Sequence, residues 1–185
     1  MQAESVRSAF DKAANSEGRS VQHIVAGLAL TAGAVLASAL VSGHSAPTEL
    51  NPKAKAAYDR LEKPSFTPPG KAFAMIWPPL FLALTISGLR VWNAPPSPAR
   101  SQALGLWGAV QGLNALWMAL GPRRLGAQLA AAMASFAASA AYVWRARAVD
   151  PPASNLVAPY LGWISFANAL TGEFWRKNQP RPTIH

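Results

Sequence analysis

The sequence contains no cysteine and few charges: 17 basic and eight acidic residues make up 14% of its 185 residues. Without thiols, the chain can form neither a disulfide framework nor a cysteine-ligated metal site. Average soluble domains carry roughly 25% charged residues, so the shortage is large. Intrinsic disorder is excluded as well, because it requires low hydrophobicity and this chain is 51% hydrophobic.

The few charges are unevenly distributed along the chain. The five longest stretches without Asp, Glu, Lys or Arg are bounded by Arg19 and Glu49, Lys71 and Arg90, Arg100 and Arg123, Arg124 and Arg145, and Asp150 and Glu173. A helix that crosses a bilayer core of about 30 Å needs about 20 residues, whereas a helix in water carries a polar face. We therefore predict an all-α protein, an integral membrane bundle of five transmembrane helices at about residues 21–43, 72–92, 101–120, 125–144 and 155–175.

The membrane domain predicted in this way covers residues 21–178. Residues 1–20 hold Val6, Phe10 and Ala13 at helical spacing, which fits either an N-terminal tail or a short interfacial helix. The apolar run that follows is longer than the 7–15-residue core of a cleaved signal peptide. A loop at 44–71 joins the first two spans, and residues 179–185 form a C-terminal tail.

The basic residues between the spans predict an orientation, because they favour the cytoplasmic side of a membrane. Seven of them lie on the N-terminal side of the predicted bundle, and ten lie on the side of the 44–71 loop and the C-terminus. This difference predicts an N-terminus outside and a C-terminus in the cytoplasm.

Two amide side chains lie within the third predicted span. Gln111 and Asn114 are three residues apart and therefore share a helix face. They either form hydrogen bonds between helices or anchor a ligand in a cavity. In the same span, Gly108 and Gly112 form a G-x-x-x-G pair, which lets helices approach closely within the bundle or between the copies of a homodimer.

The tryptophans fall into two groups. Those at span ends, where an aromatic belt is expected, are Trp92, Trp144 and Trp175. Those nearer the middle of the spans are Trp77, Trp107, Trp117 and Trp163. A cluster of indoles facing one space would suit a flat, apolar, aromatic guest.

Patterns that carry catalysis or metal binding are missing from the sequence. It has no Ser/His/acid grouping inside the predicted spans and no H-E-x-x-H, Walker or G-x-G-x-x-G motif. His23 and His44 lie at opposite ends of the first span, too far apart to share a metal ion. We therefore expect no catalytic residue, no metal site and no required cofactor. Basic residues that flank spans make membrane lipid the expected partner and do not indicate nucleic acid.

Three motifs in order resemble the TspO/MBR family of tryptophan-rich sensory proteins and the mitochondrial translocator protein, also called the peripheral benzodiazepine receptor. The first is the run 63–69, Lys-Pro-Ser-Phe-Thr-Pro-Pro, followed by Phe73 and Trp77. The second is Gln111-x-x-Asn114-x-x-Trp117. The third starts with Pro-Tyr-Leu-Gly-Trp at 159–163 and ends with Trp-Arg-x-Asn at 175–178.

This resemblance implies a five-helix bundle, often a homodimer, whose cavity binds porphyrins, haem-like tetrapyrroles and benzodiazepine-site ligands beneath the 44–71 loop as a lid. Carried over by position, the ligand-binding residues are Tyr58, Trp77, Phe81, Gln111, Asn114, Trp117, Trp163, Phe166 and Ala167. Family members in photosynthetic bacteria are linked to the regulation of tetrapyrrole and carotenoid pigments. The resemblance thus implies a bacterial protein, for which we expect the inner membrane.

The lid departs from the family pattern. Ala57, Phe66 and Lys71 stand where the family usually has aromatic residues, two of them tryptophans. Gly172 replaces the tyrosine of the animal cholesterol motif, so cholesterol binding through that motif is not expected. These differences describe a divergent bacterial member.

Three functions follow, in order of preference. The first is binding of a flat hydrophobic ligand of the porphyrin or tetrapyrrole class, for sensing, regulation or transport. The second is an accessory structural subunit packed against a larger membrane complex, such as a photosynthetic pigment–protein assembly. The third, light-dependent porphyrin breakdown as proposed for some bacterial relatives, is least favoured because the lid tryptophans are replaced.

Overall fold

A computed structural model describes residues 2–179 of the chain, and all regular structure in this part is helical. The elements are α1 (Gln2–Ala14), α2 (Val21–Ser45), α3 (Pro52–Asp59), α4 (Gly70–Asn93), α5 (Pro98–Leu120), the 3₁₀ helix η1 (Gly121–Arg123), α6 (Leu125–Val149), α7 (Pro151–Leu156) and α8 (Ala158–Lys177).

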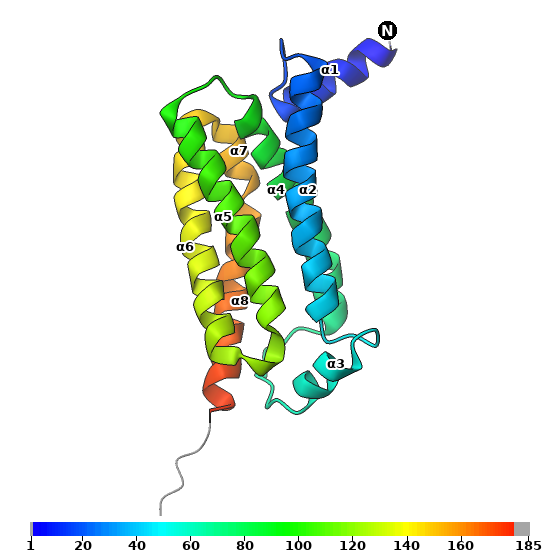
Figure 1. Cartoon of the computed structure of the whole chain (residues 1–185), viewed down its shortest axis with the longest axis vertical. Helices are drawn as coiled ribbons and strands as arrows, with labels where there is room; N and C mark the ends of the chain where they lie inside the picture. Colours follow the sequence, from blue (N-terminus) through cyan, green and yellow to red (C-terminus); the bar gives the residue numbers. More distant parts are fainter. Residues whose placement is uncertain (1, 180–185) are drawn as a thin grey trace, which may run out of the picture.

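Five long helices, α2, α4, α5, α6 and α8, lie side by side and form the bundle (Figure 1). α2 packs against both α4 and α5, and α6 packs against both α5 and α8. α4 and α8 complete the ring but approach each other less closely. α1 and α7 lie at one end of the bundle, whereas α3 and the C-terminal end of α8 lie at the other (Figure 1).

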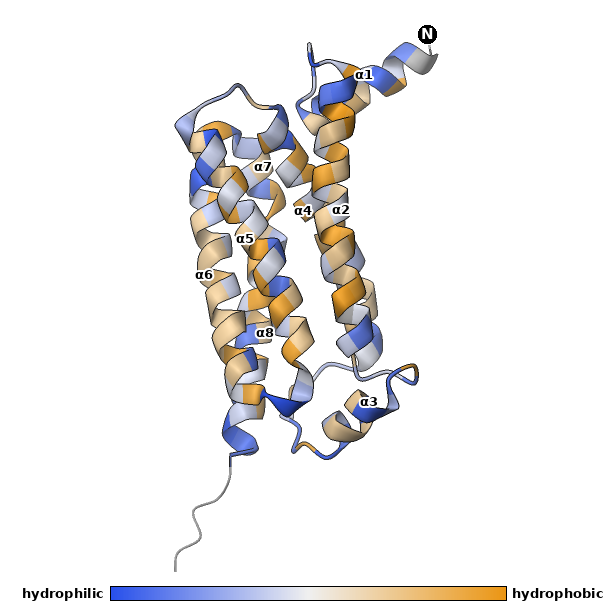
Figure 2. Cartoon of the chain, viewed as in Figure 1, coloured by the Kyte–Doolittle hydropathy of each residue, from blue (hydrophilic) through white to orange (hydrophobic). Residues whose placement is uncertain are grey.

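Four of the five predicted spans are helices long and apolar enough to cross a membrane: α2, α4, α5 with η1, and α6. Their apolar residues dominate the length of the bundle, and polar residues gather towards its two ends (Figure 2). α8 runs within the same bundle for 20 residues but is more polar, since it carries Asn168, Glu173 and two basic residues in its last turn. The helical class is confirmed, and four spans indicate an integral membrane protein.

Several boundaries differ from the prediction. α6 continues to Val149, five residues past the expected end, and stops where Asp150 adopts an extended backbone with φ −153°. Pro151 and Pro152 occupy the first turn of α7, where proline is tolerated because its missing N–H would have no partner. The helix expected at 155–175 therefore begins as the separate α7, and α8 itself starts at Ala158.

The segments left open by the sequence are partly helical. Of the two readings for residues 1–20, the structure has the helix, α1. The loop at 44–71 contains α3, whose N-cap residue Asn51 accepts a hydrogen bond from the Ala54 amide. The C-terminal tail at 179–185 lies, except for its first residue, outside the described residues.

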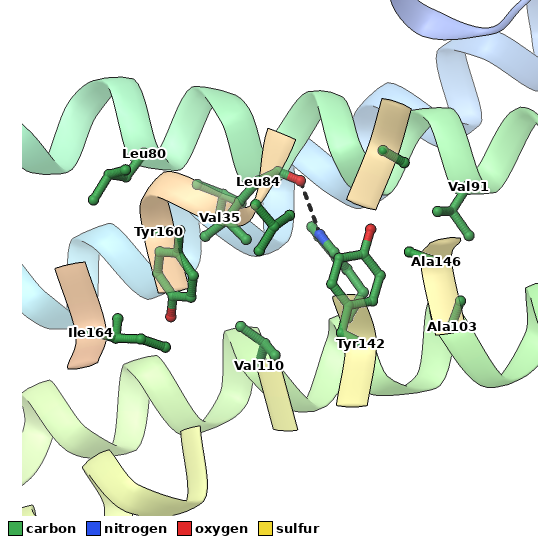
Figure 3. Close-up of a cluster of buried hydrophobic side chains, with 13 residues drawn as sticks. Val35, Leu80, Leu84, Val91, Ala103, Val110, Tyr142, Ala146, Tyr160 and Ile164 are labelled. Carbon is green, nitrogen blue, oxygen red and sulfur yellow. Dashed lines mark hydrogen bonds between the residues drawn. The ribbon is translucent and has the colours of Figure 1, made fainter. Parts of the chain in front are cut away.

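The hydrophobic core runs along the axis of the bundle. Leu84, Val110, Tyr142 and Tyr160 are completely or almost completely buried within it (Figure 3). Two of these four residues carry hydroxyl groups, and each hydroxyl needs a hydrogen-bond partner in a water-free interior. The Tyr142 hydroxyl lies 2.6 Å from Ser87 Oγ, which itself donates to the carbonyl of Ala153 at 2.7 Å. This chain of hydrogen bonds joins α4, α6 and α7.

A buried ion pair connects the segments at the α1 end of the bundle. The guanidinium of Arg90, in α4, donates from Nε to Asp150 at 2.7 Å and from Nη2 to the same carboxylate at 3.1 Å. Its Nη1 donates to the carbonyls of Lys12 and Ala13, at the C-terminal end of α1. A cation at this position also opposes the negative end of the helix dipole. Arg90 thereby ties α1 and the α6–α7 junction to α4.

Backbone carbonyls around Arg90 are also satisfied by side chains. Asn93 Nδ2 donates to the carbonyl of Ala14 at 2.9 Å, and Arg19 Nε donates to the carbonyl of Asn93 at 2.7 Å. Arg100 donates to the carbonyl of Trp92 from Nη2 at 2.6 Å. The last carbonyls of α4, which have no partner within the helix, are therefore capped by arginines from two other segments.

We expect Asp150→Ala to lower the free energy of unfolding by about 3–5 kcal/mol, because it leaves the Arg90 cation buried without its carboxylate. The measurement is unfolding in detergent micelles with increasing SDS, followed by circular dichroism. The double variant Arg90→Met/Asp150→Leu buries no charge and should recover part of the loss. A double variant as unstable as Asp150→Ala would mean that the unpaired cation is not the cause.

Gly88, in α4, lies so close to Trp107 that it has no room for a side chain. A Cβ built there would lie 2.6 Å from the indole of Trp107, whose Nε1 donates to the carbonyl of Leu84 at 3.0 Å (dashed line in Figure 3). Gly88→Ala should therefore displace the indole and reduce stability by about 1–3 kcal/mol. Gly105→Ala is the control, because a Cβ at Gly105 meets nothing within 4 Å. Equal thermal midpoints for the two variants would contradict the contact.

Candidate ligand-binding site

Aromatic side chains from three helices meet in the half of the bundle nearest the lid. The Trp77 ring, from α4, stacks on Phe81 at a centroid distance of 5.2 Å. It also lies 6.0 Å from the Trp117 ring of α5 and 6.4 Å from the Trp163 ring of α8. These are the distances of aromatic rings in direct contact. Trp77 therefore lies at the centre of a cluster that spans the space between α4, α5 and α8.

The cluster extends from Trp163 to the lid. Phe73 and Phe166 lie 5.6 and 5.4 Å from the Trp163 ring. Phe66, which precedes α4 in the chain, lies edge-on to Phe166 at 6.2 Å. Phe66 thus brings a lid aromatic against the cluster. We call the seven rings of Phe66, Phe73, Trp77, Phe81, Trp117, Trp163 and Phe166 the aromatic cluster.

Two polar atoms within the aromatic cluster lack partners. The indole Nε1 atoms of Trp117 and Trp163 are buried and donate to no hydrogen-bond acceptor among the described residues. An unsatisfied buried donor costs about 1–3 kcal/mol. A bound molecule with an oxygen acceptor within reach of these N–H groups would remove that cost.

The lid is attached to the C-terminal end of α8. The Asn178 side chain accepts from the Glu62 amide at 2.9 Å and donates to the Glu62 carbonyl at 3.0 Å. Tyr58, in α3, packs against Phe174 at a centroid distance of 5.7 Å. Burial there raises the pKa of the Tyr58 phenol above its usual value, so the lid presents a neutral aromatic side chain to α8.

Asn114 joins three helices. Its Oδ1 accepts hydrogen bonds from Ser135 Oγ of α6 at 2.9 Å and from the Tyr160 hydroxyl of α8 at 2.7 Å. Of the two readings of this residue, the contacts show hydrogen bonding between helices. Its Nδ2 is buried without a partner among the described residues.

Gln111 and Ala167 are not among the ring contacts of the aromatic cluster. Gln111 lines a groove between α5 and α2, together with small residues of both helices. Ala167 is buried where α8 faces α6, beside a small gap that Trp117 and Ser135 also line. The structure thus brings together five of the nine predicted residues, Trp77, Phe81, Trp117, Trp163 and Phe166. It places Tyr58, Gln111, Asn114 and Ala167 around or away from the aromatic cluster.

Of the four tryptophans nearer the middle of the spans, Trp107 lies outside the aromatic cluster. It is 3% exposed, packs on Gly88 and donates its N–H to Leu84. Sequence reasoning missed Phe73 and Asn178 as site residues, although both belong to the quoted motifs. It also missed Tyr160, whose partner Asn114 lies 46 positions away in the chain.

Comparison with known proteins assigns the chain to a family. The model of the TspO/MBR family matches residues 28–176. This chain belongs to the TspO/MBR family. The resemblance in the three motifs is thereby confirmed, and the match leaves α1 outside.

Three relatives show how far the similarity extends. The tryptophan-rich sensory protein of Cereibacter sphaeroides is 33% identical over 127 residues, which cover 68% of this chain and 78% of that protein. The translocator protein of Bos taurus is 33% identical over 130 residues, covering 67% and 76%. Protein CrtK of Rhodobacter capsulatus is 32% identical over 127 residues, covering 65% and 78%. The first two are named as a sensory protein and a translocator, not as enzymes.

Asn178→Ala should loosen the lid of this TspO/MBR protein, because it removes both hydrogen bonds to the backbone of Glu62. We expect the Glu62 amide to exchange with solvent roughly five- to tenfold faster. This factor corresponds to a loss of about 1–1.4 kcal/mol in the free energy of opening, the expected value for two hydrogen bonds at the surface. Hydrogen exchange followed by mass spectrometry measures this rate. Gln179→Ala is the control, since that side chain donates its hydrogen bond to the carbonyl of Trp175 and not to the lid. Unchanged exchange in Asn178→Ala would show that the other contacts, the ring pairs and the Lys177–Glu62 ion pair, are enough to hold the lid.

Proposed function

We propose that this protein binds a flat hydrophobic ligand of the porphyrin or tetrapyrrole class in its aromatic cluster, for sensing, regulation or transport. The observation that carries the proposal is the contact of Trp77 with Trp117 and Trp163 beneath the lid, with two unpartnered indole N–H groups. The ring faces supply stacking area for a planar ligand. The N–H groups of Trp117 and Trp163 are suited to carboxylate or carbonyl oxygens at its edge.

Ligand entry requires the rings to separate. Their centroid distances of 5.2–6.4 Å are those of direct contact, so a planar molecule has no room between them in this arrangement. Phe66 comes from the lid and is 47% exposed, so it is the ring that can leave with least loss of contact. Release of the Asn178 contact and withdrawal of Phe66 would open the cluster from the lid side.

The proposed role is that of a binding protein and not of an enzyme. The names of the relatives, tryptophan-rich sensory protein and translocator protein, support this choice. No group of three or more His, Cys, Asp or Glu side chains that could hold a metal occurs in the described part of the chain. In this proposal a haem or porphyrin is a ligand held by the faces of the aromatic rings.

The membrane arrangement completes the proposal. We place α8 as the fifth span, because it lies within the bundle and α6 covers one of its faces. The larger number of basic residues at the α3 end favours a cytoplasmic location for this end and for the C-terminus, in a bacterial inner membrane. A homodimer, or attachment to a larger pigment–protein complex, is compatible with the exposed apolar faces of α2 and α6.

Titration with protoporphyrin IX tests the proposed function. Saturable quenching of tryptophan fluorescence is expected, and Trp163→Ala should weaken binding about tenfold, since an aromatic stacking contact contributes about 0.5–1.5 kcal/mol beyond area burial. Trp163→Phe keeps a ring but loses the N–H, so its affinity should lie between the two. The control is Trp144→Phe, because Trp144 is 66% exposed on α6, outside the aromatic cluster.

Two results would argue against this function. Quenching that does not saturate, or is the same in Trp163→Ala, would remove the ligand site from the aromatic cluster. Purification in mild detergent with a stoichiometric membrane complex, together with no porphyrin binding, would favour the accessory-subunit role.

A further inference from the structure

A groove between α2 and α5 has no role in the proposed function. Its volume is about 310 Å³, and its lining includes Ala34, Ala37 and Val41 of α2 and Gly108, Gln111 and Gly112 of α5. The lining contains none of the rings of the aromatic cluster. The groove is therefore a second site, separate from the place proposed for a planar ligand.

Gln111 is the polar side chain that indicates a ligand in this groove. It is only 4% exposed, and neither its Oε1 nor its Nε2 has a hydrogen-bond partner among the described residues. Asn114, one turn further along α5, differs in that its oxygen accepts two hydrogen bonds. A buried amide with a free donor and a free acceptor is costly in an interior where water cannot serve it.

The glycines of α5 keep the groove open. A Cβ added at Gly108 or Gly112 would meet nothing within 4 Å. At Gly27 and Gly88, where helices or indoles do approach closely, the same Cβ would lie 2.4–2.6 Å from a tryptophan ring. The G-x-x-x-G pair therefore does not serve close packing inside the bundle. Instead, it leaves space beside the Gln111 amide.

We propose that this groove binds a single-chain lipid-like molecule whose neutral hydroxyl group meets Gln111. A hydroxyl both donates and accepts, so it satisfies the two free amide atoms together. A charged group is disfavoured, because Gln111 lies near the middle of a membrane-spanning helix and charge is costly there. The groove volume of about 310 Å³ leaves room for a hydroxyl with part of an alkyl chain.

The experiment compares two photoreactive probes in purified protein: a diazirine derivative of hexadecanol and the matching hexadecane derivative without the hydroxyl. The alcohol should label peptides of α2 and α5 at least fivefold more than the alkane, for one hydrogen bond of about 1 kcal/mol. Gln111→Leu should abolish this difference between the probes. Gly112→Leu, which fills the groove, should reduce labelling by both probes about tenfold.

The control is Gly105→Leu on the same helix. Gly105 is exposed, lies outside the groove lining, and its added side chain meets equally little resistance, so labelling should be unchanged. Ala37→Leu fills the groove from the α2 side and replaces Gly112→Leu if the latter fails to fold. Quenching by protoporphyrin IX should remain at the wild-type level in Gln111→Leu and Ala37→Leu, which separates this site from the aromatic cluster.

Two outcomes would overturn the proposal. Equal labelling by alcohol and alkane would show that Gln111 does not select a hydroxyl. Labelling that is lost only in variants that also change from dimer to monomer, as measured by light scattering, would assign the groove to contact between copies of the chain. Loss of porphyrin quenching with intact alcohol labelling would contradict the proposed function alone.

Discussion

Arg90 and Asp150 form the contact that most of the α1 end of this bundle depends on. A guanidinium inside a low-dielectric interior must meet a carboxylate and further acceptors, or the helix that carries it cannot stay buried. Asp150 supplies the charge, and the carbonyls at the end of α1 supply the remaining acceptors. One side chain of α4 therefore determines where α1 lies and how the chain turns from α6 into α7. The hydroxyl chain through Ser87 and Tyr142 continues the same polar contact between helices into the core.

The lid end is held by a different kind of contact. Rings from α4, α5 and α8 fill the interior there, and the lid is attached through the Asn178 amide at the surface and Phe66 against Phe166. Ring contacts are individually weak and not strongly directional, so they can separate and re-form around a guest. The buried ion pair holds the α1 end of the bundle together, and under the proposed function it is the lid end that would open. That division suits a membrane protein that takes up a ligand from one side.

Two amides on one face of α5 have different surroundings. Asn114 accepts hydrogen bonds from α6 and α8, whereas Gln111 meets a space between α5 and α2. Their spacing of three residues places both on one face of the helix and does not distinguish one from the other. What separates them is the shorter asparagine side chain opposite two hydroxyls, and the glycines that keep atoms away from the glutamine. Asn114 therefore stabilises the bundle, whereas the amide oxygen and nitrogen of Gln111 have no hydrogen-bond partner among the described residues.

Composition and the spacing of charges were enough to predict a helical membrane bundle, because a bilayer imposes its demands on each helix separately: a minimum length and almost no charge. The motifs were enough to indicate the family, and five of the ring positions carried over from it lie together in the structure. The predicted C-terminal end of α6 and the predicted start of the last span were less accurate. Pro151 and Pro152 mark the start of a short helix, α7, and they do not show where α6 ends. Only the tertiary structure decided that Trp107 packs on Gly88, that Asn114 meets Tyr160, and that Gln111 faces a groove. Each of these depends on a partner from another helix, far away in the sequence, and no local pattern records which helix will lie opposite.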